Sequence, residues 1–172
     1  MTKITHLKTA WMLLAVSALG LELCALYFQY VLHLEPCVLC VYERSAVALI
    51  FIAGIVGLIN PNSGLLRLAG YTLWAAGTIW GLYLSVKHSG IQMGLVKDSA
   101  SCDFIANFPA WMQLDQWLPW IFNPTGYCED VQWQFLGMSM PQSMIMVNLI
   151  YLIVFSLVMR SEYRQSKERR FV

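Results

Sequence analysis

The residues of this sequence best suited to chemistry are its five cysteines. They are Cys24, Cys37, Cys40, Cys102 and Cys128. Cys37 and Cys40 form a Cys-x-x-Cys motif, a spacing found in redox dithiols, in halves of zinc sites and in haem attachment sites. Haem attachment requires a histidine directly after the second cysteine, and this chain has Val41 at that position. Thiol–disulfide exchange and metal binding remain open.

Local sequence favours the redox interpretation. A zinc cage of Cys37, Cys40, Cys102 and Cys128 has enough ligands, but zinc sites usually offer two close pairs, and the last two cysteines are far apart. Pro36 favours the first turn of a helix. The motif would then lie at or near a helix N-terminus, where the helix dipole favours the reactive thiolate. We therefore expect a redox dithiol and no metal, with the zinc cage as the alternative.

Composition determines which elements can position these cysteines. The chain has 172 residues, of which 58% are hydrophobic and only 12% are charged. A soluble domain carries roughly 25% charged residues, so a water-soluble fold is excluded. The net charge of +1 argues against a nucleic-acid-binding protein, which shows a clustered basic excess. We predict an all-α integral membrane protein that forms one domain over residues 1–172.

Four stretches are long and apolar enough to cross a hydrocarbon layer of about 30 Å as helices. They cover about residues 10–32, 41–59, 68–86 and 143–159. The turn at Asn60–Gly64 predicts a tight antiparallel hairpin between the second and third stretches. The first stretch is too long for the hydrophobic region of a signal peptide and is expected to be an uncleaved anchor. The expected architecture is a four-transmembrane-helix bundle.

The distribution of basic residues predicts the orientation. With four crossings, both termini and the short turn share one side. That side holds eight of the eleven basic residues: Lys3, Lys8, Arg67, Arg160, Arg164, Lys167, Arg169 and Arg170. It should be cytoplasmic by the positive-inside rule. The opposite segments, about 33–40 and 87–142, hold four of the five cysteines, on the side where disulfides form and persist.

Arg44 is a cation on the side that otherwise carries few. It lies four residues after Cys40, on the same helical face, where its charge should favour the thiolate. Glu35 and Glu43 act in the opposite direction. An interfacial arginine that only sets the depth of its helix is the other interpretation. We favour a functional role because the residue runs against the overall charge distribution.

Cys102 and Cys128 flank a segment rich in aromatic residues. These are Phe104, Phe108, Trp111, Trp117, Trp120, Phe122 and Tyr127. Such a composition is typical of a segment in the membrane interface, and a short interfacial helix is expected there. A disulfide between the two cysteines would either be structural or exchange with Cys37 and Cys40 in a relay.

Taken together, these features resemble the disulfide bond formation protein B (DsbB) family of disulfide:quinone oxidoreductases. The matching segments are Leu21-Glu22-Leu23, Pro36-Cys37-Val38-Leu39-Cys40, Tyr42-Glu43-Arg44, Cys102-Asp103-Phe104, Phe108-Pro109, Phe135-Leu136-Gly137 and Met140-Pro141-Gln142. The resemblance implies a bacterial inner-membrane enzyme that reoxidises a periplasmic thioredoxin-like oxidase, DsbA. It also implies that the electrons pass to a membrane quinone, in support of disulfide formation in exported proteins.

The resemblance further implies a role for each cysteine outside the crossings. The reduced partner would attack Cys102 and form a mixed disulfide, and Cys128 would be released as a thiolate. Cys128 would then attack Cys37 and free Cys40. An oxidase that serves one dedicated partner is an alternative within the same chemistry.

The electron acceptor implied by the resemblance is ubiquinone or menaquinone. Its ring would lie beside Cys40, with Arg44 holding it or stabilising the thiolate, and with His88 close to the same ring. No flavin fingerprint or haem ligand set is visible in the sequence, which agrees with a lipid-soluble acceptor. Glu22 is expected to point into the bundle in a structural role.

Overall fold

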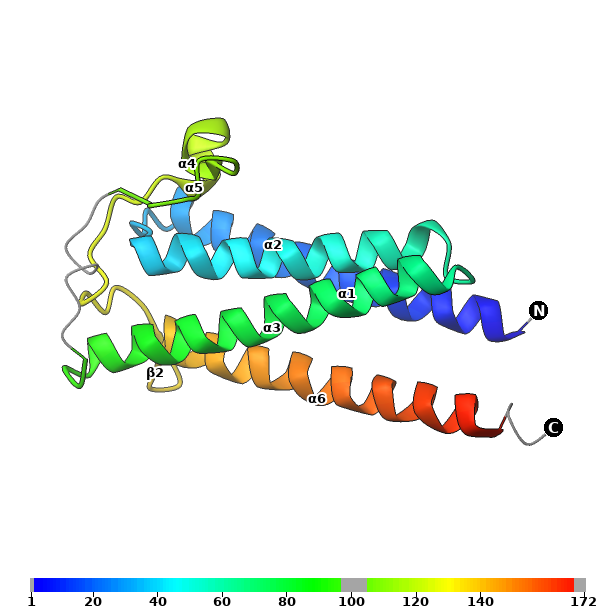
Figure 1. Cartoon of the computed structure of the whole chain (residues 1–172). Coiled ribbons are helices and arrows are strands. Elements are labelled where there is room, and N and C mark those ends of the chain that lie inside the picture. The colour runs from blue at the N-terminus through cyan, green and yellow to red at the C-terminus, as the bar shows by residue number, and fades with distance from the viewer. Residues whose placement is uncertain (1, 97–104, 169–172) are drawn as a thin grey trace.

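The computed structural model describes residues 2–96 and 105–168, with side chains for 8–96 and 105–164. Four long helices dominate: α1 (Thr2–Tyr30), α2 (Val38–Ile59), α3 (Gly64–Gln92) and α6 (Met140–Glu168). Helix α2 packs against α1 and α3, and α3 also packs against α6. Both termini lie at the same end of this bundle (Figure 1). The predicted bundle of long helices is confirmed, whereas the number of membrane crossings is a separate question.

Three helical stretches among the described residues are long and apolar enough to cross a membrane. They are Lys8–Tyr30, Val38–Ile59 and Met140–Arg164, and they overlap the first, second and fourth predicted crossings. The third prediction, residues 68–86, lies within α3, whose 29 residues match the length of α1 and α6. Helix α3 is less apolar, since it carries Thr72, Trp74, Thr78 and Ser85. A crossing by α3 stays a prediction.

The tight hairpin predicted between α2 and α3 is confirmed. The Ser63 backbone N–H donates to the Asn60 carbonyl oxygen over 3.0 Å, and the Asn62 N–H donates to the Asn60 side-chain oxygen over 3.1 Å. Farther along the hairpin, a Cβ atom on Gly77 would lie only 2.9 Å from the Ala46 carbonyl oxygen. Glycine at this position therefore lets the two helix backbones approach closely.

The end of the bundle that carries both termini has a well-packed aromatic core. The Trp11 ring lies 4.9 Å from that of Tyr71 and 6.3 Å from that of Trp74, between ring centroids. A Cβ atom on Gly57 would collide with the Trp11 ring, so this glycine makes room for it. Nearby segments of α3 and α6 are joined by an ion pair between Arg67 and Glu162. We call this region the terminal end.

The segment between α3 and α6 contains two short helices and a hairpin. The helices are α4 (Leu114–Trp117) and α5 (Pro119–Phe122), so the predicted short helix is present as two short pieces. Its position in a membrane interface stays a prediction. Strands β1 (Gln134–Phe135) and β2 (Met138–Ser139) pair antiparallel, which the sequence analysis did not predict. Positive φ angles at Leu136 and Gly137 form the two-residue turn between them.

Candidate active site

Cys37 is the N-terminal capping residue of α2. Its sulfur accepts a hydrogen bond from the Cys40 backbone N–H over 3.3 Å, so the motif lies at a helix N-terminus, as expected. The two sulfur atoms are 2.8 Å apart. The helix begins at Val38, three residues before the predicted crossing, and therefore includes Cys40 in its first turn. Both thiols are thus held by one rigid element.

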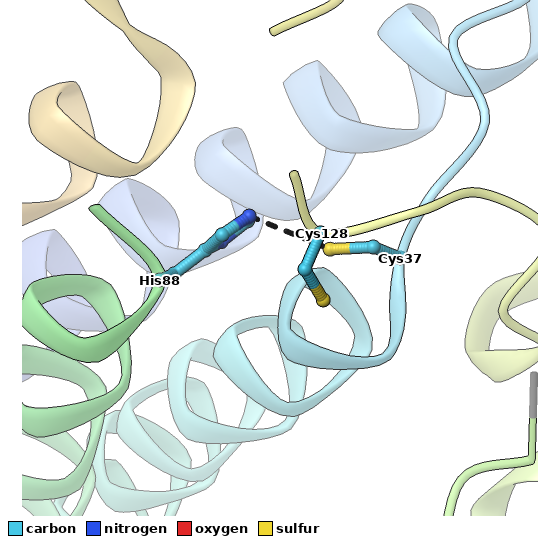
Figure 2. Close-up of side chains that lie close together, drawn as sticks. All are labelled: Cys37, His88 and Cys128. Atoms are coloured by element: carbon cyan, nitrogen blue, oxygen red, sulfur yellow. Dashed lines mark hydrogen bonds between the residues drawn. The ribbon is translucent and has the colours of Figure 1, made fainter. Parts of the chain in front are cut away.

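Cys128, although far from Cys37 in the sequence, lies close to it in the structure. Its sulfur, the Cys37 sulfur and a ring nitrogen of His88 all lie within 4.8 Å of one another (Figure 2). Cys128 is 1% exposed and Cys37 is 2% exposed. The arrangement brings one cysteine of each predicted pair within reach of thiol–disulfide exchange after a small movement.

Backbone contacts fix the position of the loop that carries Cys128. The N–H groups of Thr125 and Gly126 both donate to the Pro36 carbonyl oxygen, over 2.8 and 3.1 Å. Gln132 makes two more bonds to Glu35, accepting from its N–H over 2.8 Å and donating to its carbonyl oxygen over 3.3 Å. A side chain at Gly126 would meet the Glu35 carbonyl oxygen at 2.5 Å. We call these contacts the loop clamp.

His88 lies on α3 and connects the cysteines to a carboxylate. Its Nε2 atom is 3.5 Å from the Cys37 sulfur, and its Nδ1 atom is 3.0 Å from Glu43 Oε1. His88 and Glu43 are 3% and 5% exposed. The sequence suggested His88 from resemblance alone, whereas the structure gives it a contact with a thiol.

Arg44 joins three segments at this end of the bundle. Its Nη1 atom donates to the Gln29 side-chain oxygen over 2.5 Å and to the Ile121 carbonyl oxygen over 2.8 Å. Its Nη2 atom donates to the Ala25 carbonyl oxygen over 3.3 Å. The guanidinium is 9% exposed, so it is held inside the protein and is not extended into solvent.

A cavity of about 230 Å³ opens beside these residues. Its walls are largely apolar and include Leu21, Phe28, Val47, Met144 and Val147. Cys37, Cys40, Glu43, Arg44 and His88 supply reactive and charged groups to its lining. Glu22 also lines it, and its buried Oε1 atom has no hydrogen-bond partner among the described residues. An apolar cavity with a few polar groups is typical of a site for a small organic ligand.

The two neighbouring thiols differ in acidity. The hydrogen bond from Cys37 lowers the pKa of Cys128 to about 6 despite the burial of this thiol, and the Leu39 backbone N–H and the charge of His88 act in the same direction. Burial raises the pKa of Cys37, and its hydrogen bonds with Cys128 and Cys40 raise it further. Of the two reduced thiols, Cys128 is therefore the one that favours the thiolate, which is the reactive form of cysteine.

The structure brings together five of the six site residues named from the sequence. Cys37, Cys40, Cys128, Arg44 and His88 surround the region just described, whereas Cys102 lies outside the described residues. Cys24 is exposed on α1 and is not among the clustered ligand atoms.

Sequence reasoning missed Glu43 as a site residue. It treated this carboxylate only as a charge opposing the thiolate, but the structure makes it the partner of His88. The available signal was its spacing, since a residue three positions after Cys40 on a helix shares its face.

Comparison with known proteins gives one consistent family. The family model described as disulfide bond formation protein DsbB matches residues 7–158. A disulfide bond formation protein B from Psychromonas ingrahamii is 47% identical over 168 residues, which cover 98% of this chain and 90% of the relative. One from Pectobacterium atrosepticum is 48% identical over 162 residues, with 94% and 91% covered. One from Aeromonas hydrophila is 46% identical over 151 residues, with 88% and 87% covered.

Proposed function

Because this chain belongs to the DsbB family of disulfide:quinone oxidoreductases, we propose that Cys102, Cys128, Cys37 and Cys40 carry electrons in that order. The protein is a multi-pass membrane enzyme that reoxidises DsbA and supports disulfide bond formation. The observation that carries the proposed order is the contact between Cys128 and Cys37 beside His88. It joins two cysteines that are far apart in the sequence at the point where one pair must pass electrons to the other.

The relay begins at a disulfide between Cys102 and Cys128. A thiolate of reduced DsbA attacks Cys102, a mixed disulfide forms, and Cys128 leaves as a thiolate. Cys128 then attacks the sulfur of Cys37 in a second disulfide, with Cys40 as the leaving thiolate. A bond between Cys37 and Cys128 forms while the bond between Cys37 and Cys40 breaks, so two electrons reach Cys40 and none are lost.

Electrostatics supports this direction of transfer. In the fully reduced protein the low pKa of Cys128 makes it a thiolate at neutral pH, whereas Cys37 stays protonated. When Cys37 is in a disulfide it donates no hydrogen bond, but the Leu39 backbone N–H and the charge of His88 still favour the Cys128 thiolate. Cys40 lies in the first turn of α2, where the positive end of the helix dipole stabilises a leaving thiolate. Arg44 adds a fixed positive charge to the same cavity.

A quinone, ubiquinone or menaquinone, would occupy the cavity beside Cys40. Its chemistry is that of a two-electron, two-proton acceptor. The residues present fit such a group, because the walls are apolar while Arg44 and charged His88 would donate to ring oxygens, as Glu22 would when protonated. Arg44 would orient the ring, and the apolar walls would exclude water from the reacting sulfur.

The sidedness of the enzyme belongs to the same proposal. The cysteine motif and both termini lie at opposite ends of the bundle (Figure 1). Eight of the eleven basic residues belong to the terminal end, the short turn or the tails, which supports a cytoplasmic position for both termini. The cysteines would then face the periplasm of the bacterial inner membrane. In a Cys128→Ala variant, the Cys102 thiolate would attack the disulfide of an oxidised partner and hold it as a mixed disulfide. The proteins isolated in this way would distinguish a general partner from a dedicated one.

Replacing Cys40 tests the relay most directly. Purified Cys40→Ser protein, given reduced DsbA and ubiquinone, should lose at least 99% of its quinone reduction, because no thiolate remains to pass on electrons. Quinone absorbance measures the rate. Mass spectrometry of the isolated protein should find any bond between Cys37 and Cys128 accompanied by a free Cys102, because without Cys40 this bond forms only when the Cys37 thiolate attacks Cys128 and Cys102 leaves. Cys24→Ser serves as the matched thiol control and should keep most of the activity. Full turnover by Cys40→Ser would contradict the relay.

A further inference from the structure

We propose that the fully reduced protein binds one zinc-class divalent cation through Cys37, His88 and Cys128, and that this binding stops the relay. The proposal rests on the proposed function, because it assigns a second, competing state to two of the relay cysteines. It differs from a structural zinc cage of four cysteines in its ligands and in its consequence, which is inhibition.

The three ligand atoms lie close to the spacing of a metal site. In a tetrahedral zinc site, bond lengths of about 2.3 Å to sulfur and 2.0 Å to nitrogen put a sulfur and a nitrogen roughly 3.5 Å apart. The Cys37 sulfur and His88 Nε2 are 3.5 Å apart, and the Cys128 sulfur lies within 4.8 Å of both. The side chains converge from three different parts of the chain (Figure 2). Only small side-chain movements would close the site.

Glu43 prepares the histidine for this role. In neutral His88 whose Nδ1–H donates a hydrogen bond to the carboxylate oxygen 3.0 Å away, the lone pair of Nε2 faces the Cys37 sulfur, and zinc binding selects this form. A carboxylate that orients a ligating histidine in this way is a common feature of zinc sites. Glu43 is thus a positioning residue, and its burial at 5% exposure keeps the pair away from water.

The ligand types select the class of cation. Two thiolates and one imidazole suit zinc and similar soft ions, whereas magnesium and calcium prefer oxygen ligands. Cys40 is not one of the proposed ligands. Its sulfur is 2.8 Å from that of Cys37, whereas two sulfurs bound to one tetrahedral zinc are roughly 3.8 Å apart. The fourth position would hold water, and Cys37 and His88 line the cavity through which a cation could enter.

Binding and electron transfer exclude each other. The cation takes the place of the proton on Cys37 and, where His88 is charged, of the proton on its Nε2 atom. No electron moves, so a chelator reverses zinc binding. A disulfide at Cys37 or Cys128 removes a thiolate ligand, so oxidised protein has no site. Conversely, a zinc-bound Cys128 thiolate cannot attack Cys37.

Metal binding can be measured without partner or quinone. Protein reduced and desalted without oxygen is dialysed against Zn²⁺, and bound metal is counted by atomic emission; Co²⁺ gives a visible spectrum that reports thiolate ligation. Wild-type protein should bind one metal per chain when reduced and none when oxidised. His88→Ala and Cys128→Ser, on different segments, should each weaken binding at least tenfold. Cys24→Ser and Cys40→Ser should retain it.

The controls separate the possible failures. Helical circular dichroism and titration of the remaining thiols confirm that each variant is folded and reduced. Unchanged binding in folded His88→Ala, no uptake by reduced wild-type protein, or loss of metal in Cys40→Ser would each overturn the site. Glu43→Gln, which keeps a hydrogen-bond acceptor, should bind more tightly than Glu43→Ala.

Activity assays distinguish this proposal from the proposed function. Quinone reduction is measured first without metal and then with Zn²⁺, which should inhibit wild-type turnover until a chelator is added. Turnover without any metal uptake would contradict only the proposed metal site. Metal uptake without turnover would contradict only the proposed relay.

Discussion

The two ends of the helical bundle are built on opposite principles. At the terminal end, Trp11, Tyr71 and Trp74 pack ring against ring. At the cysteine end, Glu43 and Arg44 are buried beside a cavity. Buried polar and charged groups cost free energy unless they are paired, whereas close-packed aromatic side chains stabilise the fold. One end of the bundle therefore supplies stability, and the other keeps reactive groups in place.

The pairing at the cysteine end shows how that cost is limited. Arg44 makes three hydrogen bonds, and His88 uses both ring nitrogens. Glu22 departs from this pattern, since its buried Oε1 atom has no partner among the described residues. An unpaired polar atom that lines a cavity is the kind of local inconsistency expected where a ligand binds.

The largest effect should come from breaking the terminal end. Trp11→Ala removes a buried ring that Gly57 accommodates, and should lower the free energy of unfolding by about 3 kcal/mol, mainly through the cavity left behind. Unfolding in mixed micelles measures this change. Trp111→Ala is the matched control, because this ring is 75% exposed, and should shift the free energy by less than about 0.5 kcal/mol. The rate of thiol exchange in folded Trp11→Ala should match that of wild type. A loss of thiol exchange alongside the loss of stability would contradict the division between the two ends.

A smaller effect should follow from pH at the cysteine end. Because the pKa of Cys128 is lowered to about 6, its thiolate persists above that pH and is lost as the pH falls through it. In reduced protein the ratio of thiolate to thiol at Cys128 should fall about tenfold for each unit of pH. Thiolate ultraviolet absorbance of reduced protein, minus that of Cys128→Ser, measures the titration.

Cys37→Ala provides the internal control for this titration. It removes the hydrogen bond that contributes most to the shift, so the pKa of Cys128 should rise towards the usual thiol value of about 8.5. A Cys128 pKa that stays near 6 in this variant would show that the hydrogen bond from Cys37 does not lower it.

The smallest effect should come from the ion pair between Arg67 and Glu162. Their side chains are 24% and 20% exposed, so water and salt weaken the attraction. A double-mutant cycle with Arg67→Gln and Glu162→Gln should give a coupling of about 1 kcal/mol or less, decreasing in high salt. A coupling comparable to the loss in Trp11→Ala would mean that charge, and not aromatic packing, stabilises the terminal end.

Much of this architecture could be predicted from local sequence. Apolar runs predicted the helices, and the breakers at Asn60–Gly64 predicted the hairpin, because both signals depend on residues close in the chain. Pro36 likewise predicted that Cys37 lies at a helix N-terminus. The hairpin of β1 and β2 was missed because two-residue strands show no useful alternation.

Contacts between distant segments could not be predicted in the same way. The approach of Cys128 to Cys37 depends on hydrogen bonds from Thr125 and Gly126 to a backbone carbonyl, which carry no signature in residue type. The pairing of His88 with Glu43 requires the rotation of α3 against α2, which hydrophobic patterning specifies only coarsely. The resemblance supplied the cysteine roles, but not these contacts.

The loop clamp has a consequence for the kinetics of the enzyme. The exchange proposed between Cys128 and Cys37 is unimolecular because both belong to one chain, and the loop clamp keeps them close by fixing Gly126 and Gln132 against the segment that precedes Cys37. Well-oriented groups in one molecule can react as though present at about 10⁵ M or more. The internal step should therefore be independent of enzyme concentration, and dilution should slow only the encounter with the soluble partner.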